Sequence, residues 1–187
     1  VPVYALGFPL ADTDIALLDD DGRPVADGEA GEIAIREREE HVLFKGYFND
    51  PDATARAFLG DWYLTGDLAR RDPDTGAYFY KDRKKDAVRF GGRNISTWEV
   101  ESVVRQYPDV QDCAAFGIPS KEVESEDELK INIVLTQGAS PSYEDVAAFI
   151  NDNGPYYFVP RYMEFVTELP YTPNQKVQKY RMREQGV

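Results

Sequence analysis

Alternation of apolar and polar residues in the first half of the chain predicts a series of short β-strands. Residues 13–18 (TDIALL) and 31–36 (GEIAIR) stand on either side of a turn rich in Asp and Gly, so they predict a strand, a turn and a second strand. Two further strands are predicted at 62–65 and 77–80, separated by the turn-forming residues 72–76. This part of the chain is therefore expected to be β-rich.

Beyond Arg83 the pattern alternates between strands and helices. Ser96 followed by Glu99 is a capping box that starts a helix extending to about Tyr107, because the two side chains can satisfy free amides at the helix start. Ser142 precedes a second helix. Strands are predicted at 110–118, 129–135 and 161–166. This order, with short connections, predicts an α+β sandwich of roughly 100 residues.

The net charge argues against nucleic acid as a partner. The chain of 187 residues carries 34 Asp and Glu against 21 Lys and Arg, which gives a formal net charge of −13. An acidic surface repels polyanions and anionic lipid. No apolar stretch approaches the roughly 20 residues that span a bilayer, and no leader opens the chain, so we expect a cytoplasmic protein without a membrane span.

Cysteine and histidine counts exclude several kinds of chemistry. Cys113 and His41 are the only residues of their types, so a disulfide scaffold, a Cys/His zinc site and a catalytic unit built around a His with Ser or Cys are excluded. We expect no metal site in this chain. Any reaction must depend on carboxylates, Lys, Arg, Tyr or the backbone.

Basic residues gather in two short segments of this acidic chain. They are Lys81, Arg83, Lys84, Lys85, Arg89 and Arg93 in the first segment, and Lys176, Lys179, Arg181 and Arg183 in the second. Such clusters can hold a phosphate-bearing ligand, although a solvated face is the simpler interpretation of a Lys-rich segment. Gly91 and Gly92 allow close approach of a ligand to the main chain, and a Pro-fixed loop at 170–176 presents one Lys.

Three segments, taken in their order along the chain, resemble motifs of one enzyme superfamily. They are YLTGD at 63–67, KDRKKDAVRFGGRNISTWEVE at 81–101 and LPYTPNQKVQK at 169–179. The chain resembles the C-terminal part of the adenylate-forming, or AMP-binding, enzymes, which include acyl-CoA synthetases, luciferases and peptide-synthetase adenylation domains. It is most similar to the acyl-CoA ligases. The resemblance extends from about Gly7 to Arg183, with Gln175 where the family usually has Gly.

The resemblance implies roles for three charged residues. Asp67 matches the Asp that binds the adenosine ribose hydroxyls, and Arg83 matches the nucleotide-binding Arg. Lys176 falls on the catalytic Lys of adenylation. The family forms an acyl-AMP from a carboxylic acid and ATP, and then transfers the acyl group to coenzyme A.

The resemblance also implies a division into two domains within an α+β fold. Residues 1–84 would be the β-rich end of a large domain, part of a distorted β-barrel, and 85–187 a mobile α+β domain with a sheet of three or more strands and flanking helices. Rotation about a hinge at Lys85 would bring in the face that carries Gly91 and Gly92, where the thiol of coenzyme A enters.

The partners implied are a carboxylic acid, coenzyme A and the missing N-terminal part of the same enzyme. ATP and Mg²⁺ would bind mostly through that part, because the Ser/Thr/Gly-rich phosphate loop of the family is absent from these residues. We therefore expect the chain to be inactive alone. Other readings stay open: a non-catalytic binding module on the same fold, a peptide-synthetase adenylation domain, or, outside the resemblance, an anion-binding α+β protein.

Overall fold

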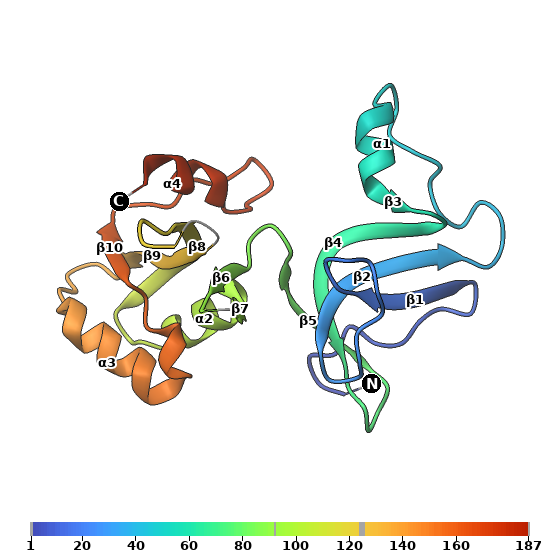
Figure 1. Ribbon diagram of the computed structural model, residues 1–187. Coiled ribbons are helices and arrows are strands. Elements are labelled where there is room, and N and C mark those ends of the chain that lie inside the picture. Colours follow the sequence, from blue (N-terminus) through green and yellow to red (C-terminus); the bar gives the residue numbers. More distant parts are fainter. Residues whose placement is uncertain (1, 92, 124–125, 187) are drawn as a thin grey trace. The chain divides into compact units, whose positions relative to one another are not determined.

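The computed structural model describes residues 2–91, 93–123 and 126–186 (Figure 1). The chain divides into two compact units, Val1–Lys85 and Asp86–Val187. The division falls one residue beyond the expected boundary, and each unit is described by itself below. Among the described residues, no helix has both the length and the apolar character needed to cross a membrane.

The first unit is a curled antiparallel sheet with one short helix (Figure 1). Its elements, in chain order, are β1 (Thr13–Leu18), β2 (Ala30–Glu37), α1 (Pro51–Ala57), β3 (Phe58–Leu59), β4 (Trp62–Arg71) and β5 (Tyr78–Arg83). The strand order is β1-β2-β4-β3, and β5 also pairs with β4. The predicted β-rich character and the half-barrel curl are therefore confirmed.

Strand β4 is longer than the sequence pattern predicts. A strand was predicted at 62–65, but β4 continues to Arg71 and carries the segment 63–67 in its interior. Gly66 has a φ of 74°, which only Gly adopts easily, and the pairing with β5 shifts register between Leu68 and Ala69. The strand continues because Ala69 is fully buried in the core beyond this irregularity.

The second unit is an α+β sandwich, as predicted, with a small hairpin before its first helix. Its elements are β6 (Val88–Phe90), β7 (Arg93–Ile95), α2 (Thr97–Val104), β8 (Val110–Pro119), β9 (Asp127–Leu135), α3 (Tyr143–Asn153), a 3₁₀ turn (Tyr156–Phe158), β10 (Tyr162–Val166) and α4 (Lys179–Gln185). The main sheet has the order β10-β9-β8, with β9 antiparallel to β8 and parallel to β10.

Both faces of this sheet are covered, because alternate residues of its strands point to opposite sides. On β8, Cys113 and Ala115 pack into a core with α2 and α3. Phe116 belongs to a second cluster that includes Leu169 and Met182. The second cluster fixes α4 and the loop before it, which contains Lys176, on the opposite face of the sheet from α2.

Two details of the second unit differ from the sequence pattern. Helix α2 ends at Val104, not near Tyr107, and the side chain of its C-cap residue Arg105 donates to the carbonyl of Cys113 at 3.1 Å. Helix α4 was not predicted, because it is short, lacks a side-chain cap and buries only Met182. Such a helix depends on its tertiary contacts more than on its local sequence.

A pair of Val substitutions tests where the core of the second unit lies. Val146→Ala should lower the free energy of unfolding by about 2 kcal/mol, because Val146 on α3 is fully buried. Val123→Ala is the matched control and should change it by less than about 0.5 kcal/mol, because Val123 is 46% exposed. Urea denaturation measures both, and equal losses would contradict this position of the core.

Candidate functional site

Asp67 and Arg83 lie opposite each other on neighbouring strands. Their Cα positions pair directly across β4 and β5, and Arg83 Nε lies 2.7 Å from Asp67 Oδ1. The contact balances charge without the alignment of a hydrogen bond, so among the described residues this buried Oδ1 has no hydrogen-bond partner. A buried carboxylate oxygen without such a partner is an acceptor suited to a ligand hydroxyl.

A buried carboxylate that the sequence analysis missed holds this strand segment in place. Glu32 on β2 is 6% exposed, and its Oε1 accepts from the Gly66 amide at 3.0 Å. Its Oε2 accepts from Lys84 Nζ at 2.9 Å. Burial alone would lower the pKa of Lys84, but its hydrogen bonds to Glu32 and Asp20 outweigh that effect and raise it. The Lys84 amide also donates to the Gly66 carbonyl at 2.8 Å.

The boundary between the units lies between Lys85 and Asp86. On one side, Lys84 is bound within the first unit through Glu32 and Asp20. On the other, Asp86 accepts from Arg183 of α4 at 3.0 Å within the second unit. The exposed side chain of Lys85 stands between these two anchored neighbours.

Gly91 in the turn after β6 has a φ of 57°, a conformation that L-residues other than Gly adopt at a cost. Its amide donates to Glu126 Oε2 at 3.0 Å, and a Cβ added to it would meet open space. Gly92, the other predicted residue of this turn, lies outside the described residues. A substitution at Gly91 would therefore be limited by backbone strain and not by a steric clash within the second unit.

Lys176 is exposed at the tip of a short loop between β10 and α4. Its amide donates to Thr172 Oγ1 at 3.0 Å, and its carbonyl accepts from the Thr172 amide at 2.8 Å. Gln175 before it has a φ of 61°, in the left-handed region that favours Gly. The loop therefore keeps the backbone shape of a Gly-containing turn with a Gln in that position.

The structure brings only part of the predicted site together. Asp67 and Arg83 are adjacent within Val1–Lys85, whereas Lys176 and Gly91 belong to Asp86–Val187.

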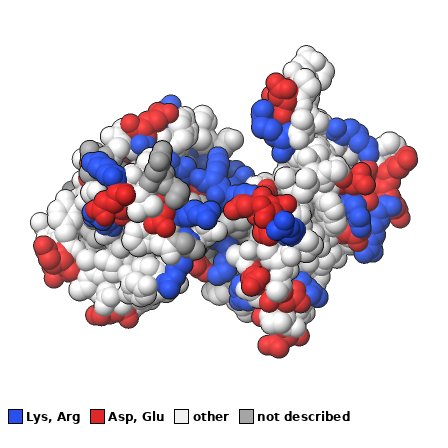
Figure 2. All heavy atoms as spheres, viewed as in Figure 1, with Lys and Arg blue, Asp and Glu red and all other residues white. Residues whose placement is uncertain are grey.

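The two basic clusters are partly neutralised. In Figure 2 the visible face of each unit carries basic side chains among acidic ones. Arg83 pairs with Asp67, and Lys179 pairs with the buried Glu101 of α2 at 2.8 Å. Some basic residues of the two clusters therefore form ion pairs within the protein, and only the others remain for a ligand.

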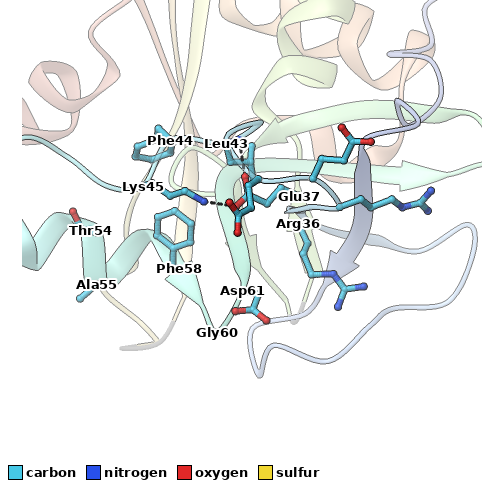
Figure 3. Close-up of a pocket in the computed structure, with 13 residues that line it drawn as sticks. Arg36, Glu37, Leu43, Phe44, Lys45, Thr54, Ala55, Phe58, Gly60 and Asp61 are labelled. Atoms are coloured by element: carbon cyan, nitrogen blue, oxygen red, sulfur yellow. Dashed lines mark hydrogen bonds and ion pairs between the residues drawn. The ribbon is translucent and has the colours of Figure 1, made fainter.

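The first unit contains a cavity of about 540 Å³, lined by residues of β2, α1 and β3 and of the loops beside them (Figure 3). Its cations are already paired: Arg36 donates to Asp14, and Lys45 donates to Glu37. Its aromatic wall includes Phe44 and Phe58, which contact the ring of Tyr63 from the segment 63–67. None of the predicted site residues lines this cavity.

The only cysteine is not available as a nucleophile. Cys113 is fully buried, and burial raises the pKa of its thiol to about 12. Its Sγ contacts the carbonyl of Glu101 at 3.7 Å. Among the described residues no group of three or more His, Cys, Asp or Glu is arranged to hold a metal ion.

Two carboxylates, Glu32 and Glu101, were missed by sequence reasoning. Glu32 lies on the same side of β2 as Ala34 and Arg36, opposite Ile33 and Ile35, so the alternation of the strand gave no sign that it is buried. Glu101 lies inside α2 among apolar residues. In each case the sequence shows an acidic residue between positions that are buried. This pattern points to a buried carboxylate only when the basic residue that pairs with it is also known.

The comparisons with known proteins agree on one group of enzymes. Residues 99–176 match the sequence family described as AMP-binding enzyme C-terminal domain. The crotonobetaine/carnitine–CoA ligases of Salmonella paratyphi B and Salmonella typhi are each 34% identical over 166 residues, which covers 88% of this chain and 32% of theirs. The chain thus spans about a third of the length of the curated relatives it matches.

Solved structures of similar fold belong to the same group. An amide bond synthetase from Marinactinospora thermotolerans is 31% identical with a TM-score of 0.82, covering 98% of this chain and 37% of its own. An anthranilate CoA ligase in complex with anthranoyl-AMP is 31% identical with a TM-score of 0.84, covering 99% and 35%. A benzoate CoA ligase from Burkholderia xenovorans is 30% identical with a TM-score of 0.78, covering 98% and 36%.

A substitution at Gln175 tests the strain in the Lys176 loop. Gln175→Gly should raise the free energy of unfolding by about 0.5–1 kcal/mol, because the strain that it removes exceeds the greater freedom of Gly in the unfolded chain. Ala148→Gly, at an exposed position inside α3, is the control and should lower it by about 1 kcal/mol. Urea denaturation distinguishes the two, and a loss of stability in both variants would contradict strain at Gln175.

Proposed function

We propose that this chain, whose residues 99–176 match the AMP-binding enzyme C-terminal domain family, is the C-terminal part of an ATP-dependent acyl-CoA ligase. This enzyme forms an acyl-AMP from a carboxylic acid and ATP, and then an acyl-CoA thioester. ATP, a carboxylic acid and coenzyme A are its substrates. The segments that complete the nucleotide and acyl sites lie in other parts of the enzyme, so these 187 residues alone do not activate an acid.

The observation that carries this proposal is the pairing of Asp67 with Arg83. Asp67 Oδ1 is buried without a hydrogen bond, although it lies 2.7 Å from Arg83 Nε. In the proposed complex this oxygen accepts from a ribose hydroxyl of the adenosine, and Arg83 helps to orient the nucleotide. Glu32 fixes the backbone of this segment before a ligand arrives, which reduces the cost of ordering it on binding.

Lys176 supplies the positive charge in the proposed first half-reaction. A carboxylate oxygen attacks the α-phosphorus of ATP, the bond to the β-phosphate oxygen breaks, and pyrophosphate leaves. Negative charge moves between the two reactants, so an ammonium group that bridges them stabilises the transition state. The exposed position of Lys176 on a hydrogen-bonded loop suits a group that must enter a site formed elsewhere.

In the second half-reaction the thiol sulfur of coenzyme A attacks the acyl carbonyl and AMP leaves. We assign the face around Gly91 and Gly92 to the arriving pantetheine arm. The open space beside Gly91 supports this assignment, because an absent side chain leaves room for a thin substrate.

In this proposal, rotation of the second unit about Lys85 switches the enzyme from the first half-reaction to the second. Supporting it, Lys84 and Asp86 are each ion-paired within their own unit, which concentrates backbone freedom at the residue between them. Lys176 then leaves the nucleotide as the Gly91 face arrives. Such use of one hinge for two chemical steps is a known kind of domain switch.

An amine is a second candidate acceptor for the acyl group. The similarity to an amide bond synthetase favours it, since the chain matches that protein as well as it matches the CoA ligases. Both readings share the adenylation step. They differ in whether acyl-AMP is consumed by coenzyme A or by an amine.

Replacement of Lys176 tests the proposed adenylation. In the enzyme that contains this chain, Lys176→Ala should lower ATP–pyrophosphate exchange by about a hundredfold to a thousandfold, because one transition-state charge contact is lost. Thioester formation from supplied acyl-AMP should change little. Lys121→Ala, at an exposed Lys of the same unit, is the control variant. Equal losses in both half-reactions would show that Lys176 is structural.

A proline at the hinge tests the proposed rotation. Lys85→Pro fixes φ near −65° and should trap one orientation, so one half-reaction should fall much further than the other. Lys85→Ala keeps backbone freedom and should support both. Circular dichroism checks that each variant is folded. If both half-reactions proceed at the wild-type rate in a folded Lys85→Pro variant, rotation is not centred there.

A further inference from the structure

Among the described residues, Thr172 is the hydrogen-bond partner of the Lys176 backbone. Both the amide and the carbonyl of Lys176 are bonded to Thr172, at 3.0 and 2.8 Å. An antiparallel bridge between Tyr171 and Val177 closes the loop that contains Thr172 and Lys176. The position of Lys176 therefore follows the position of Tyr171 and Thr172 at the entry to the loop.

The hydroxyl of Tyr171 ties this entry to the main sheet. It donates to Oδ2 of Asp112, while Oδ1 of Asp112 accepts from the Cys113 amide at 2.8 Å and from Arg105 Nε at 3.4 Å. The pairing of β8 with β9 shifts register between Val110 and Asp112, an irregularity of the kind that re-aims a side chain. Tyr171 is 41% exposed, so its hydroxyl and not burial of its ring fixes it.

The exit of the same loop is tied to the same group of charges. Lys179 Nζ lies 2.8 Å from Glu101 Oε1 and 2.7 Å from Thr97 Oγ1. Arg105 joins the two attachment points, because its Nη2 donates to Glu101 and its Nε donates to Asp112. The loop is thus attached at both ends to one network on α2 and β8.

We propose that Asp112 and Tyr171 are positioning residues for Lys176, through a hydrogen bond that holds the loop entry while Lys179 and Glu101 hold its exit. The kinetic part of this proposal rests on the proposed function, and its structural part does not. The hydroxyl suits the role across ordinary pH, since its hydrogen bond to Asp112 raises the pKa of Tyr171 to about 12 and keeps the donor proton in place.

Amide hydrogen exchange of the chain tests the structural part. Tyr171→Phe removes only the hydroxyl, and exchange at the amides of Gln175 and Lys176 should become about tenfold faster with an unchanged melting temperature. Asp112→Asn should have a similar effect. Tyr180→Phe is the matched control, because Tyr180 is 53% exposed on α4 and should leave these amides unchanged.

Half-reaction kinetics of the enzyme that contains this chain test the catalytic part. Tyr171→Phe should lower kcat for adenylation about tenfold with the KM for ATP unchanged, because Lys176 reaches the transition state less often. Thioester formation from supplied acyl-AMP should not change. The double variant with Asp112→Asn should lose no more than the more affected single variant, because all three act on the same hydrogen bond.

Three results would overturn the proposal. One is unchanged loop exchange in both Tyr171→Phe and Asp112→Asn. Another is faster loop exchange together with wild-type adenylation, and the third is additive losses in the double variant. If the wild-type enzyme shows no ATP–pyrophosphate exchange at all, the proposed function fails, and the amide-exchange experiment still decides whether this hydrogen bond holds the Lys176 loop.

Discussion

The carboxylate of Glu32 is the constraint on which the candidate site of the first unit depends. It accepts a hydrogen bond from the backbone of Gly66 with one oxygen and from the ammonium group of Lys84 with the other. Burial of a carboxylate costs free energy unless hydrogen bonds or ion pairs satisfy both oxygens. A shift of the chain at Gly66 or Lys84 would therefore leave a buried charge uncompensated. One acid thereby fixes the segment that carries Asp67 and the residue that precedes Lys85.

The second unit repeats this arrangement with different elements. Glu101 on α2 is 7% exposed and accepts from the amide of Ala115 at 2.9 Å, as well as from Lys179 and Arg105. In both units a buried acid immobilises one Lys, and a second Lys a few residues away stays exposed. Lys84 and Lys179 are held by ion pairs, whereas the side chains of Lys85 and Lys176 have no ion-pair partner among the described residues. The ion-paired Lys side chains stabilise the fold, whereas the others can move or meet a ligand. The sequence alone shows both kinds only as members of the same basic clusters.

The fold could be predicted from the sequence wherever local rules decide the structure. Ser96 and Ser142 cap helices as expected, and alternation identified the strands of the main sheet, because capping and side-chain alternation are properties of neighbouring residues. Helix α4 and the continuation of β4 beyond Asp67 were missed, since both depend on partners distant in sequence.

Of the candidate site, only the residues within recognisable motifs could be predicted from the sequence. Asp67, Arg83 and Lys176 were found because their surrounding motifs resemble those of a known family. Glu32 and Asp112 were not, because their importance comes from contacts made 34 and 59 residues away along the chain, with Gly66 and Tyr171. Spacing along a chain identifies a motif, but it does not identify the residues that hold the motif in position.

The burial of Cys113 has a consequence for thiol exchange. A thiol with a pKa of about 12 is almost entirely protonated at neutral pH, and the thiolate is the form that attacks disulfides. Because this is the only cysteine of the chain, these residues offer no site for a mixed disulfide with a soluble thiol cofactor. Oxidised coenzyme A or glutathione would therefore leave this part of the protein unmodified as long as its core stays closed.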